Sequence, residues 1–422
     1  MKFNDFHRNV KTRIYIMFIF GIAQSMTFPF MAIYFDRYYG NAFTGLFFTI
    51  SIIASLVSGS ISGYYADRTG RKKILVGAEI VFFSAFVLTA IANSPWWTSP
   101  AITAVMFFVI NVSFGVYGPV DDAMLLDVTT SENRQFMYQI FYWGHNLTMA
   151  VGTAIGAFLF EKYRFGLFCF VAFAVLCSMV ATIFVIVDTY DPKKAKESNS
   201  IGKKVGKTGF LHNYLTVFKD FVFMSFVTAG LLLMTLEFQL SNYIGIRLSK
   251  EVKPQDVLFL HIDGIKMLGF LQTENTVVVV LLATLVAKLI KRFPDHKVLY
   301  TGCFMFTVGY SLITTSSSPL LLFGAMLLAT VGEVMRVPVQ QSYIGDIAPV
   351  HARSSYMAVN GMTYQVARVI ASLGVLLGGI LSPFQMGLVA FFVGLAGILL
   401  YSLMMPKLRL RKELNAEAEA TG

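Results

Sequence analysis

Residues 63–73 read GYYADRTGRKK, a charged stretch that lies between two long apolar runs at about 43–65 and 74–93. An apolar run of about 20 residues is long enough to cross a bilayer as an α-helix. Gly70 permits a tight turn between two such helices, and the four lysine and arginine residues within 68–73 favour the cytoplasmic side of a membrane. The stretch therefore predicts a cytoplasmic loop between two membrane-spanning helices.

The composition of the whole chain points the same way. Of the 422 residues, 56% are hydrophobic and only 14% are charged, whereas soluble domains are nearer a quarter charged. The net charge of +10 would suit a nucleic-acid-binding protein, but the positive residues gather in short clusters between apolar runs. We therefore expect a membrane protein whose positive charges set its topology, with no nucleic acid as a partner.

Hydropathy predicts an all-α membrane protein with twelve transmembrane helices. The first apolar run is too long for a cleaved signal peptide and is expected to remain as a helix. An even number of helices places both termini on the same side of the membrane. The expected helices cover about 14–35, 43–65, 74–93, 99–126, 136–160, 165–187, 220–247, 268–290, 298–316, 319–345, 355–380 and 384–405.

Positive residues are divided unequally between the two sides of this topology. Segments on the side of the termini hold 25 of the 34 lysine and arginine residues, and the opposite side holds seven. Because positive residues favour the cytoplasmic side, we expect a multi-pass protein of the cell membrane with both termini in the cytoplasm.

The longest segment on the terminus side, 188–219, is basic and rich in glycine and serine. This composition is typical of a flexible linker. It divides the chain into a six-helix half at 1–187 and another at 220–405, with a cytoplasmic tail at 406–422. On the opposite side, 248–267 is expected to be a plain connector, a short interfacial helix or a lid.

Two helix ends share a proline, an aspartate and an arginine at the same spacing, and the two sets are offset by 219 residues. An offset of about half the chain indicates two repeated halves, as transporters are often built. The first set is Pro119, Asp127 and Arg134, and the second is Pro338, Asp346 and Arg353.

The 63–73 loop resembles the signature loop of the major facilitator superfamily. The strings at 123–134, 142–147 and 332–340 resemble its twelve-helix drug:proton antiporter group, including lactococcal multidrug transporters. The resemblance implies a monomeric secondary transporter of two six-helix halves that alternates access between the two sides. It also implies that the proton gradient is the energy source and that no cofactor is needed.

The resemblance further implies a gate on the cytoplasmic side. In it, Asp127 pairs with basic residues of the 67–72 loop, and Gly63 lets neighbouring helices approach closely. The expected gating residues are Asp67, Arg68, Gly70, Arg71, Asp127 and Arg134, with Asp346 and Arg353 as the counterpart in the second half.

Ionisable residues at membrane depth are costly and are functional candidates. Glu333 and Arg336 lie three residues apart, hence on one helix face, where they form either a structural ion pair or a substrate or proton site. The resemblance implies that Glu333 is the substrate-site glutamate, and we predict that Arg336 or Arg368 alternates as its partner. The candidates for substrate or proton binding are Glu333, Arg336, Arg368, Glu237, His145 and Asp122.

Several details of these candidates are left open. His145 is either a hydrogen-bonded packing residue or a proton site. Asp121 and Asp122 are adjacent and must face different ways, and Glu79 and Glu274 are set aside because they lie near predicted helix ends. The aromatic candidates for a cavity lining are Tyr34, Tyr117, Tyr142, Trp143 and Tyr364.

Helix five carries Gly152 and Gly156, four residues apart, which form a small-residue packing face. Their position resembles the antiporter motif of drug exporters, without its usual proline. The chain also departs from the group at Phe141 and Ser241, where related antiporters have aspartates, and at Asn111, near the usual helix-four arginine.

These features favour a secondary active transporter, in particular proton-coupled efflux of amphiphilic or drug-like compounds. Proton-coupled uptake of a sugar, peptide or other metabolite and flipping of a lipid-like molecule are the alternatives. The chain has no nucleotide-binding loop and no HExxH motif, and its cysteines lack metal-ligand spacing. An enzyme is therefore not expected, nor is a metal site.

Overall fold

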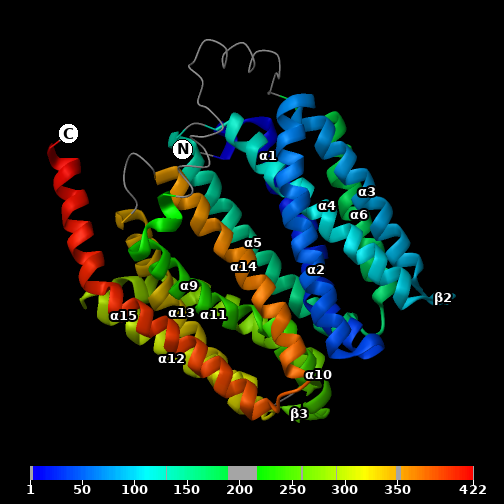
Figure 1. Cartoon of the computed structure of the whole chain (residues 1–422). Coiled ribbons are helices and arrows are strands. Elements are labelled where there is room, and N and C mark those ends of the chain that lie inside the picture. The colour runs from blue at the N-terminus through cyan, green and yellow to red at the C-terminus, as the bar shows by residue number, and fades with distance from the viewer. Residues whose placement is uncertain are drawn as a thin grey trace. The chain divides into compact units, whose positions relative to one another are not determined.

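The computed structural model describes residues 3–129, 131–188, 216–257, 260–290, 292–347 and 353–421. The chain separates into two compact units, Met1–Lys204 and Val205–Gly422, which run from blue to green and from green to red in Figure 1. The division falls inside the predicted linker 188–219, most of which lies outside the described residues. Each unit is considered by itself below.

The N-terminal unit consists of helices, with one short hairpin of β1 and β2 between α3 and α4. α3 packs on both α4 and α6, α2 packs on α4, and α1 packs on α5 and α6. The elements are η1 (Phe3–Asp5), α1 (Arg8–Ser25), η2 (Phe28–Phe30), α2 (Met31–Thr69), α3 (Arg71–Ile91), β1 (Asn93–Ser94), β2 (Trp97–Thr98), α4 (Pro100–Asp127), α5 (Ser131–Leu159) and α6 (Arg164–Phe184).

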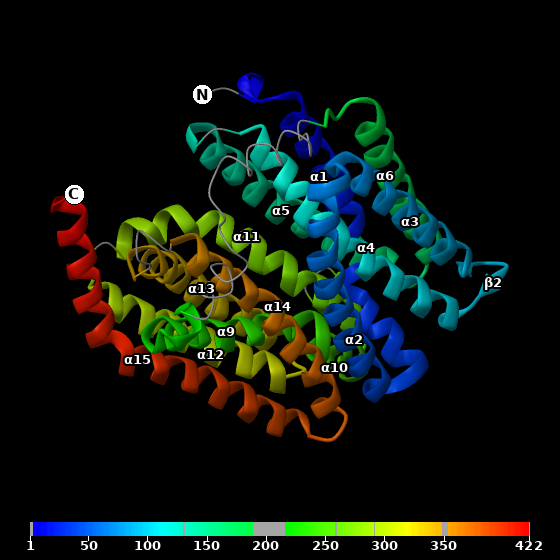
Figure 2. The same cartoon turned by 45° about the horizontal axis from the view of Figure 1, so that its top comes forward.

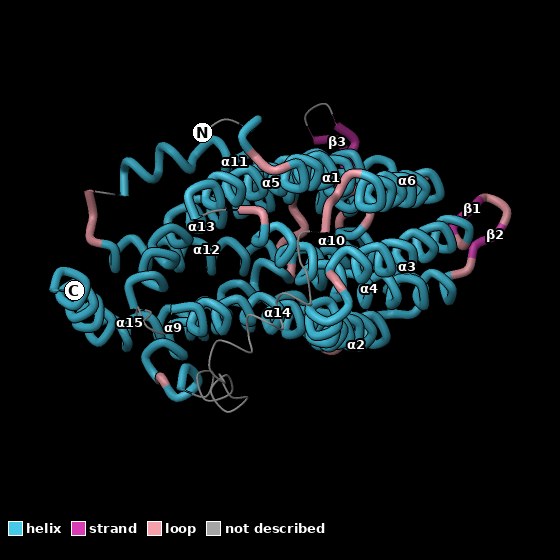
Figure 3. Tube along the Cα trace, turned by 90° about the horizontal axis from the view of Figure 1, so that it is seen from above, coloured by secondary structure: helices cyan, strands magenta, loops and turns pink. Residues whose placement is uncertain are grey.

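The C-terminal unit is also helical, and α12 lies beside both α13 and α15 (Figure 2). Strands in the described residues are confined to two hairpins, drawn in magenta in Figure 3. The elements are α9 (Phe221–Phe238), η3 (Leu240–Ile244), α10 (Gly245–Glu251), β3 (Gln255–Val257), β4 (Leu260–Ile262), α11 (Gly264–Ile290), α12 (Asp295–Thr315), α13 (Pro319–Ile347), α14 (Arg353–Gly378) and α15 (Pro383–Thr421).

Within the described residues, ten segments are long and apolar enough to cross a membrane. One of them, Arg8–Ala66, is 59 residues long and contains the first two predicted helices. It is interrupted by η2, which contains Pro29, and by Gly40, whose φ of +77° a residue with a side chain rarely adopts. Each of the twelve predicted stretches coincides with helix, so the all-α prediction is confirmed.

Two boundary predictions differ from the structure. The predicted tail at 406–422 is not a separate segment, because α15 continues through Pro406 to Thr421. Within 248–267, α10 ends at Glu251 and the antiparallel β3–β4 hairpin follows, so the interfacial helix predicted as one alternative is wrong.

Close contact between α1 and α5 depends on the two glycines of helix five. A Cβ atom added to Gly156 would lie 2.5 Å from the carbonyl oxygen of Met26, and one added to Gly152 would lie 2.5 Å from Cβ of Ser25. Side chains at these positions would push the helices apart, so the predicted small-residue packing face is confirmed.

The predicted packing role of Gly63 is wrong. A Cβ atom at Gly63 would meet nothing within 4 Å. α2 and α4 approach most closely about two turns earlier, where a Cβ atom on Gly115 would lie 2.0 Å from the carbonyl oxygen of Ser55. The signature stretch therefore begins after the point of close contact.

Candidate functional site

A carboxylate with neutral partners lies inside the C-terminal unit. Glu333 of α13 is half-buried, and its Oε2 accepts a hydrogen bond of 2.9 Å from Nδ2 of Asn275 on α11. The same Asn275 nitrogen donates to the hydroxyl of Thr330, one turn earlier on α13, at 3.1 Å. The carboxylate that the sequence predicts to be the substrate site thus has a neutral amide as its hydrogen-bond partner, and the same amide binds the Thr330 hydroxyl.

Arg336 lies on α13 one turn beyond Glu333, but its contacts lead elsewhere. It is 3% exposed, and its Nη2 lies 3.7 Å from Oε2 of Glu237 on α9. Its Nη1 donates to Gln340 at 3.2 Å, and its guanidinium carbon lies 4.1 Å from the ring centroid of Phe306 on α12. The structure therefore pairs Arg336 with Glu237 rather than with Glu333.

This arrangement leaves one negative charge uncompensated. Glu237 and Glu333 supply two carboxylates, Arg336 supplies one guanidinium, and the described residues place no ion-pair partner beside Glu333. A half-buried charge without an ion-pair partner has lost part of its hydration without compensation. Binding a cation or a proton at Glu333 would remove the imbalance.

Arg368, the other predicted partner of Glu333, is half-buried on α14 and donates through Nη1 to Oε1 of Gln365 at 3.2 Å. Its alternation with Glu333 stays a prediction. Tyr364, one turn earlier, packs edge-on against Phe238, with ring centroids 5.0 Å apart.

Two further candidates lie on the surface of the N-terminal unit. His145 is exposed on α5, so its predicted role as a packing residue is wrong. Asp122 is exposed on α4, whereas its neighbour Asp121 faces α1. The two aspartates therefore point in different directions, as predicted from their adjacency.

Ser241 and Asn111, at which the chain departs from related antiporters, bind groups close to them. Ser241 accepts a hydrogen bond of 2.6 Å from Gln272, and Asn111 donates to the carbonyl oxygen of Phe107 at 2.8 Å. Of the aromatic candidates, Tyr34 is buried and Tyr117 is half-buried, while the exposed ones are Tyr142, Trp143 and Tyr364.

The signature loop adopts the turn that the sequence predicts. Gly70 has a φ of +102°, which only glycine adopts without strain. Immediately after it, Arg71 forms an ion pair with Asp127 at the end of α4 and donates to the carbonyl oxygen of Ala123 at 2.8 Å. The predicted pairing of Asp127 with this loop is confirmed.

Other basic residues of the loop bind nearby groups. The Lys72 ammonium donates to the carbonyl oxygens of Ile183 and Ile186 at 2.8 and 2.9 Å, at the end of α6, where a positive charge is favourable. Arg68 stacks on the ring of Tyr64, at 3.9 Å from its centroid. The side chains of the other gating candidates, Asp67, Arg134, Asp346 and Arg353, lie outside the described residues.

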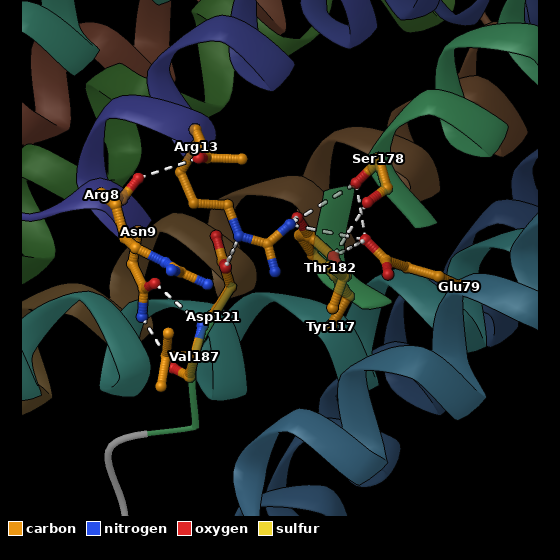
Figure 4. Close-up of polar contacts among 10 residues, drawn as sticks. Arg8, Asn9, Arg13, Glu79, Tyr117, Asp121, Ser178, Thr182 and Val187 are labelled. Carbon is orange, nitrogen blue, oxygen red and sulfur yellow. Dashed lines mark hydrogen bonds and ion pairs between the residues drawn. The ribbon is translucent and has the colours of Figure 1, made fainter. Parts of the chain in front are cut away.

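A charged network in the N-terminal unit was not predicted (Figure 4). Arg13 of α1 forms ion pairs with Asp121 at 2.6 Å and with Glu79 of α3 at 3.4 Å. Glu79 was set aside because it lies near the start of the predicted helix 74–93, and Arg13 lies just outside the predicted helix 14–35. The structure begins α1 at Arg8 and α3 at Arg71, which places Arg13 inside α1 and Glu79 eight residues after the start of α3. Extending each predicted helix by one turn at both ends would have identified Arg13 and Glu79 as charged residues within helices.

Comparison with known proteins supplies the family context. A family model described as Major Facilitator Superfamily matches residues 14–261 and 255–421. A protein of Planococcus maritimus described as "Na(+), Li(+), K(+)/H(+) antiporter" is 33% identical over 383 residues, which are 89% of this chain and 90% of that protein.

More distant similarities agree on the fold. Multidrug resistance protein MdtG of Proteus mirabilis is 23% identical over 204 residues, or 45% of this chain and 48% of that protein. The solved structure of a peptide transporter, POT, in complex with sulfate superimposes with a TM-score of 0.73 at 16% identity, covering 98% of this chain and 97% of that one. At such identity the likeness concerns the fold alone.

Proposed function

The chain belongs to the major facilitator superfamily of secondary transporters, and we propose that it exports monovalent cations in exchange for protons. The proposal is supported by the 33% identical relative described as an antiporter of Na⁺, Li⁺ or K⁺ and H⁺. It is carried by one observation within this chain: in the part that the structure describes, the carboxylate of Glu333 binds the neutral amide of Asn275 and forms no ion pair, while Arg336 pairs with Glu237.

The surroundings of Glu333 suit a small hard cation. Such ions prefer oxygen ligands from carboxylates, amides, hydroxyls and water. The Asn275 amide now directs its NH₂ group toward the Glu333 carboxylate and the Thr330 hydroxyl. Rotation of this amide would present its oxygen to the same place, so that three oxygen-bearing groups converge on one cation.

Competition at one carboxylate would give antiport. An ionised Glu333 attracts a cation, and a protonated Glu333 has no charge with which to hold it. If the proton-bound and cation-bound forms reorient and the empty form does not, a proton entering from one side exchanges for a cation leaving by the other. The Glu237–Arg336 pair keeps the second carboxylate neutralised during this exchange.

The topology and the gate complete the proposal. We place both termini in the cytoplasm of a cell-membrane protein, because positive residues gather on the terminus side. The Arg71–Asp127 ion pair then holds the cytoplasmic ends of α3 and α4 together. Opening toward the cytoplasm would loosen this pair and the matching segment around Asp346.

Amphiphilic organic cations are the second candidate substrate. Phe238 directly follows Glu237 in α9 and packs edge-on against Tyr364 of α14. Aromatic faces attract organic cations. The similarity to a multidrug resistance protein over 45% of the chain also supports this candidate.

The test uses the full chain in proteoliposomes that hold an acidic interior and a pH-sensitive dye. External sodium, lithium, potassium or tetraphenylphosphonium is then added, and alkalinisation of the interior reports exchange. Glu333→Gln removes the proposed site, and Glu161→Gln, which alters an exposed carboxylate paired with Arg37, is the matched control.

We expect sodium, lithium or potassium to release the protons from wild type and from Glu161→Gln but not from Glu333→Gln. A response to tetraphenylphosphonium alone would show that the substrates are organic cations rather than alkali cations. No response to any of the four, with protein correctly inserted, would refute proton-coupled cation export.

A further inference from the structure

The charged network of the N-terminal unit is separate from the cation site and joins four helices (Figure 4). Its charged members are Arg13 of α1, Glu79 of α3 and Asp121 of α4, with side chains that are 2%, 1% and 16% exposed. Tyr117 of α4 accepts a hydrogen bond of 2.7 Å from Nη1 of Arg13. These three ionisable groups are therefore buried together, and they belong neither to the proposed cation site nor to the gate.

The two oxygens of Glu79 have very different surroundings. Oε1 accepts hydrogen bonds from Ser178 at 2.6 Å and Thr182 at 3.0 Å, both on α6, and from Arg13 at 3.4 Å. Oε2 is buried and has no hydrogen-bond partner. The three donors hold the side chain in one orientation and leave Oε2 as an open position.

The charges in the network do not balance. Two carboxylates face one guanidinium, and among the described residues the neighbouring α2, α5 and α6 add no further charged side chain to it. With both carboxylates ionised the network carries a net negative charge, which is costly to bury. One added proton makes it neutral, and two carboxylates that share an arginine titrate as a coupled unit.

The network lies close to one end of the helices. Arg13 and Glu79 lie five and eight residues after the starts of α1 and α3, and Asp121 lies six residues before the end of α4. At a rise of about 1.5 Å per residue, these positions are roughly 8–12 Å from the helix ends. Asp121, the most exposed member, offers the shortest route for a proton to leave.

We propose that this network is a second protonation site, which takes up and releases one proton at Oε2 of Glu79 during the transport cycle. The carboxylate gains the proton and becomes a neutral carboxyl group, and the release step reverses this with no other change. The inference rests on the proton coupling proposed above and adds a site in the other unit. A purely structural network would keep a fixed charge at every pH at which the protein is folded.

The first test is infrared difference spectroscopy of the purified full chain between acidic and alkaline pH, which needs no transport. Glu79→Gln keeps an oxygen to accept the donors of α6 but cannot titrate. Ser178→Ala keeps the acid and removes the donor at 2.6 Å. Glu161→Gln is the control.

We expect a carboxyl C=O band that titrates in wild type and in Glu161→Gln and is lost in Glu79→Gln. In Ser178→Ala the band should persist with a shifted frequency and midpoint, so the test remains valid if Glu79→Gln fails to fold. A Glu79→Gln spectrum identical to that of wild type, or no change in Ser178→Ala, would overturn the proposal.

The second test separates this site from the proposed function. In proteoliposomes, Glu79→Gln should lose export driven by a pH gradient and keep the exchange of labelled for unlabelled cation at equal pH. Proton-driven export at the wild-type rate in this variant would overturn the second site. If wild type itself shows no proton-driven export, the proposed function fails, while the infrared titration still decides whether Glu79 binds a proton.

Discussion

Single residues decide what the C-terminal site can bind. Glu333 has neutral partners, whereas Glu237 faces Arg336 at 3.7 Å. Sodium binding to the purified protein should therefore weaken as the pH falls, because protons compete for the same carboxylate. Where protons occupy most of the sites, the apparent affinity should fall about tenfold per pH unit. Calorimetric titration at several pH values measures this.

Variants of the two carboxylates sharpen the first prediction. Glu333→Gln should remove sodium binding at every pH while the protein stays folded, because glutamine can still accept the Asn275 hydrogen bond. Glu237→Gln should instead lower the stability of the unit, because it leaves the buried Arg336 without its carboxylate. Equal sodium affinity and pH dependence in wild type and Glu333→Gln would return Glu333 to a structural role.

The Arg71–Asp127 pair gives a second prediction at this scale. Asp127→Asn should leave folding intact, because a partly exposed ion pair contributes only about 0–1 kcal/mol and Arg71 keeps its bond to Ala123. Transport should slow as the gate loses its latch. Spin labels at the terminus-side helix ends should report more molecules open on that side. Normal transport with unchanged label distances would show that the pair has no gating role.

At the scale of elements, the close contact between α1 and α5 depends on glycine, which has no Cβ atom. Gly156→Ala places a Cβ atom 2.5 Å from the Met26 carbonyl oxygen, and such overpacking costs about 1–3 kcal/mol. We expect a lower thermal unfolding temperature in detergent. Gly77→Ala, where a Cβ atom meets nothing within 4 Å, should equal or exceed wild type. Equal losses in both variants would argue against close packing at Gly156.

Sequence patterns predicted the helices better than their ends. Apolar runs located each long helix of the described residues, because crossing a bilayer requires about 20 apolar residues. They do not report polar turns that continue a helix beyond the apolar run, as at Arg8 in α1 and Arg71 in α3. For that reason Arg13 and Glu79 resembled charges near helix ends, and the apolar runs did not predict that they form an ion pair.

Contacts between helices were the other limit. The spacing of Glu333 and Arg336 correctly places them on one helix face, but the partner of Arg336 comes from α9, almost a hundred residues earlier in the chain. The pairing of Arg71 with Asp127 was predictable because the family resemblance carried it. Where no motif supplied the partner, as for Asn275 with Glu333, no sequence pattern pointed to the contact.

At the scale of the whole molecule, each of the two compact units contains two carboxylates and one buried arginine. In the C-terminal unit these are Glu237, which pairs with Arg336, and Glu333, which does not, and in the N-terminal unit Glu79 and Asp121 both pair with Arg13. Among the described residues, each group has one more carboxylate than arginine. In an antiporter, proton binding and cation binding must influence one another. A group with one excess negative charge allows this, because either a proton or a cation can neutralise it.

That dependence can be measured most directly by driving the exchange with a cation gradient instead of a pH gradient. Proteoliposomes with equal pH on both sides are given an outward gradient of sodium, potassium or lithium, with the membrane voltage clamped to zero. Coupled exchange should acidify the interior as the cation leaves, and the acidification should stop when the pH gradient balances the cation gradient. A cation flux that leaves the internal pH unchanged would contradict proton-coupled antiport.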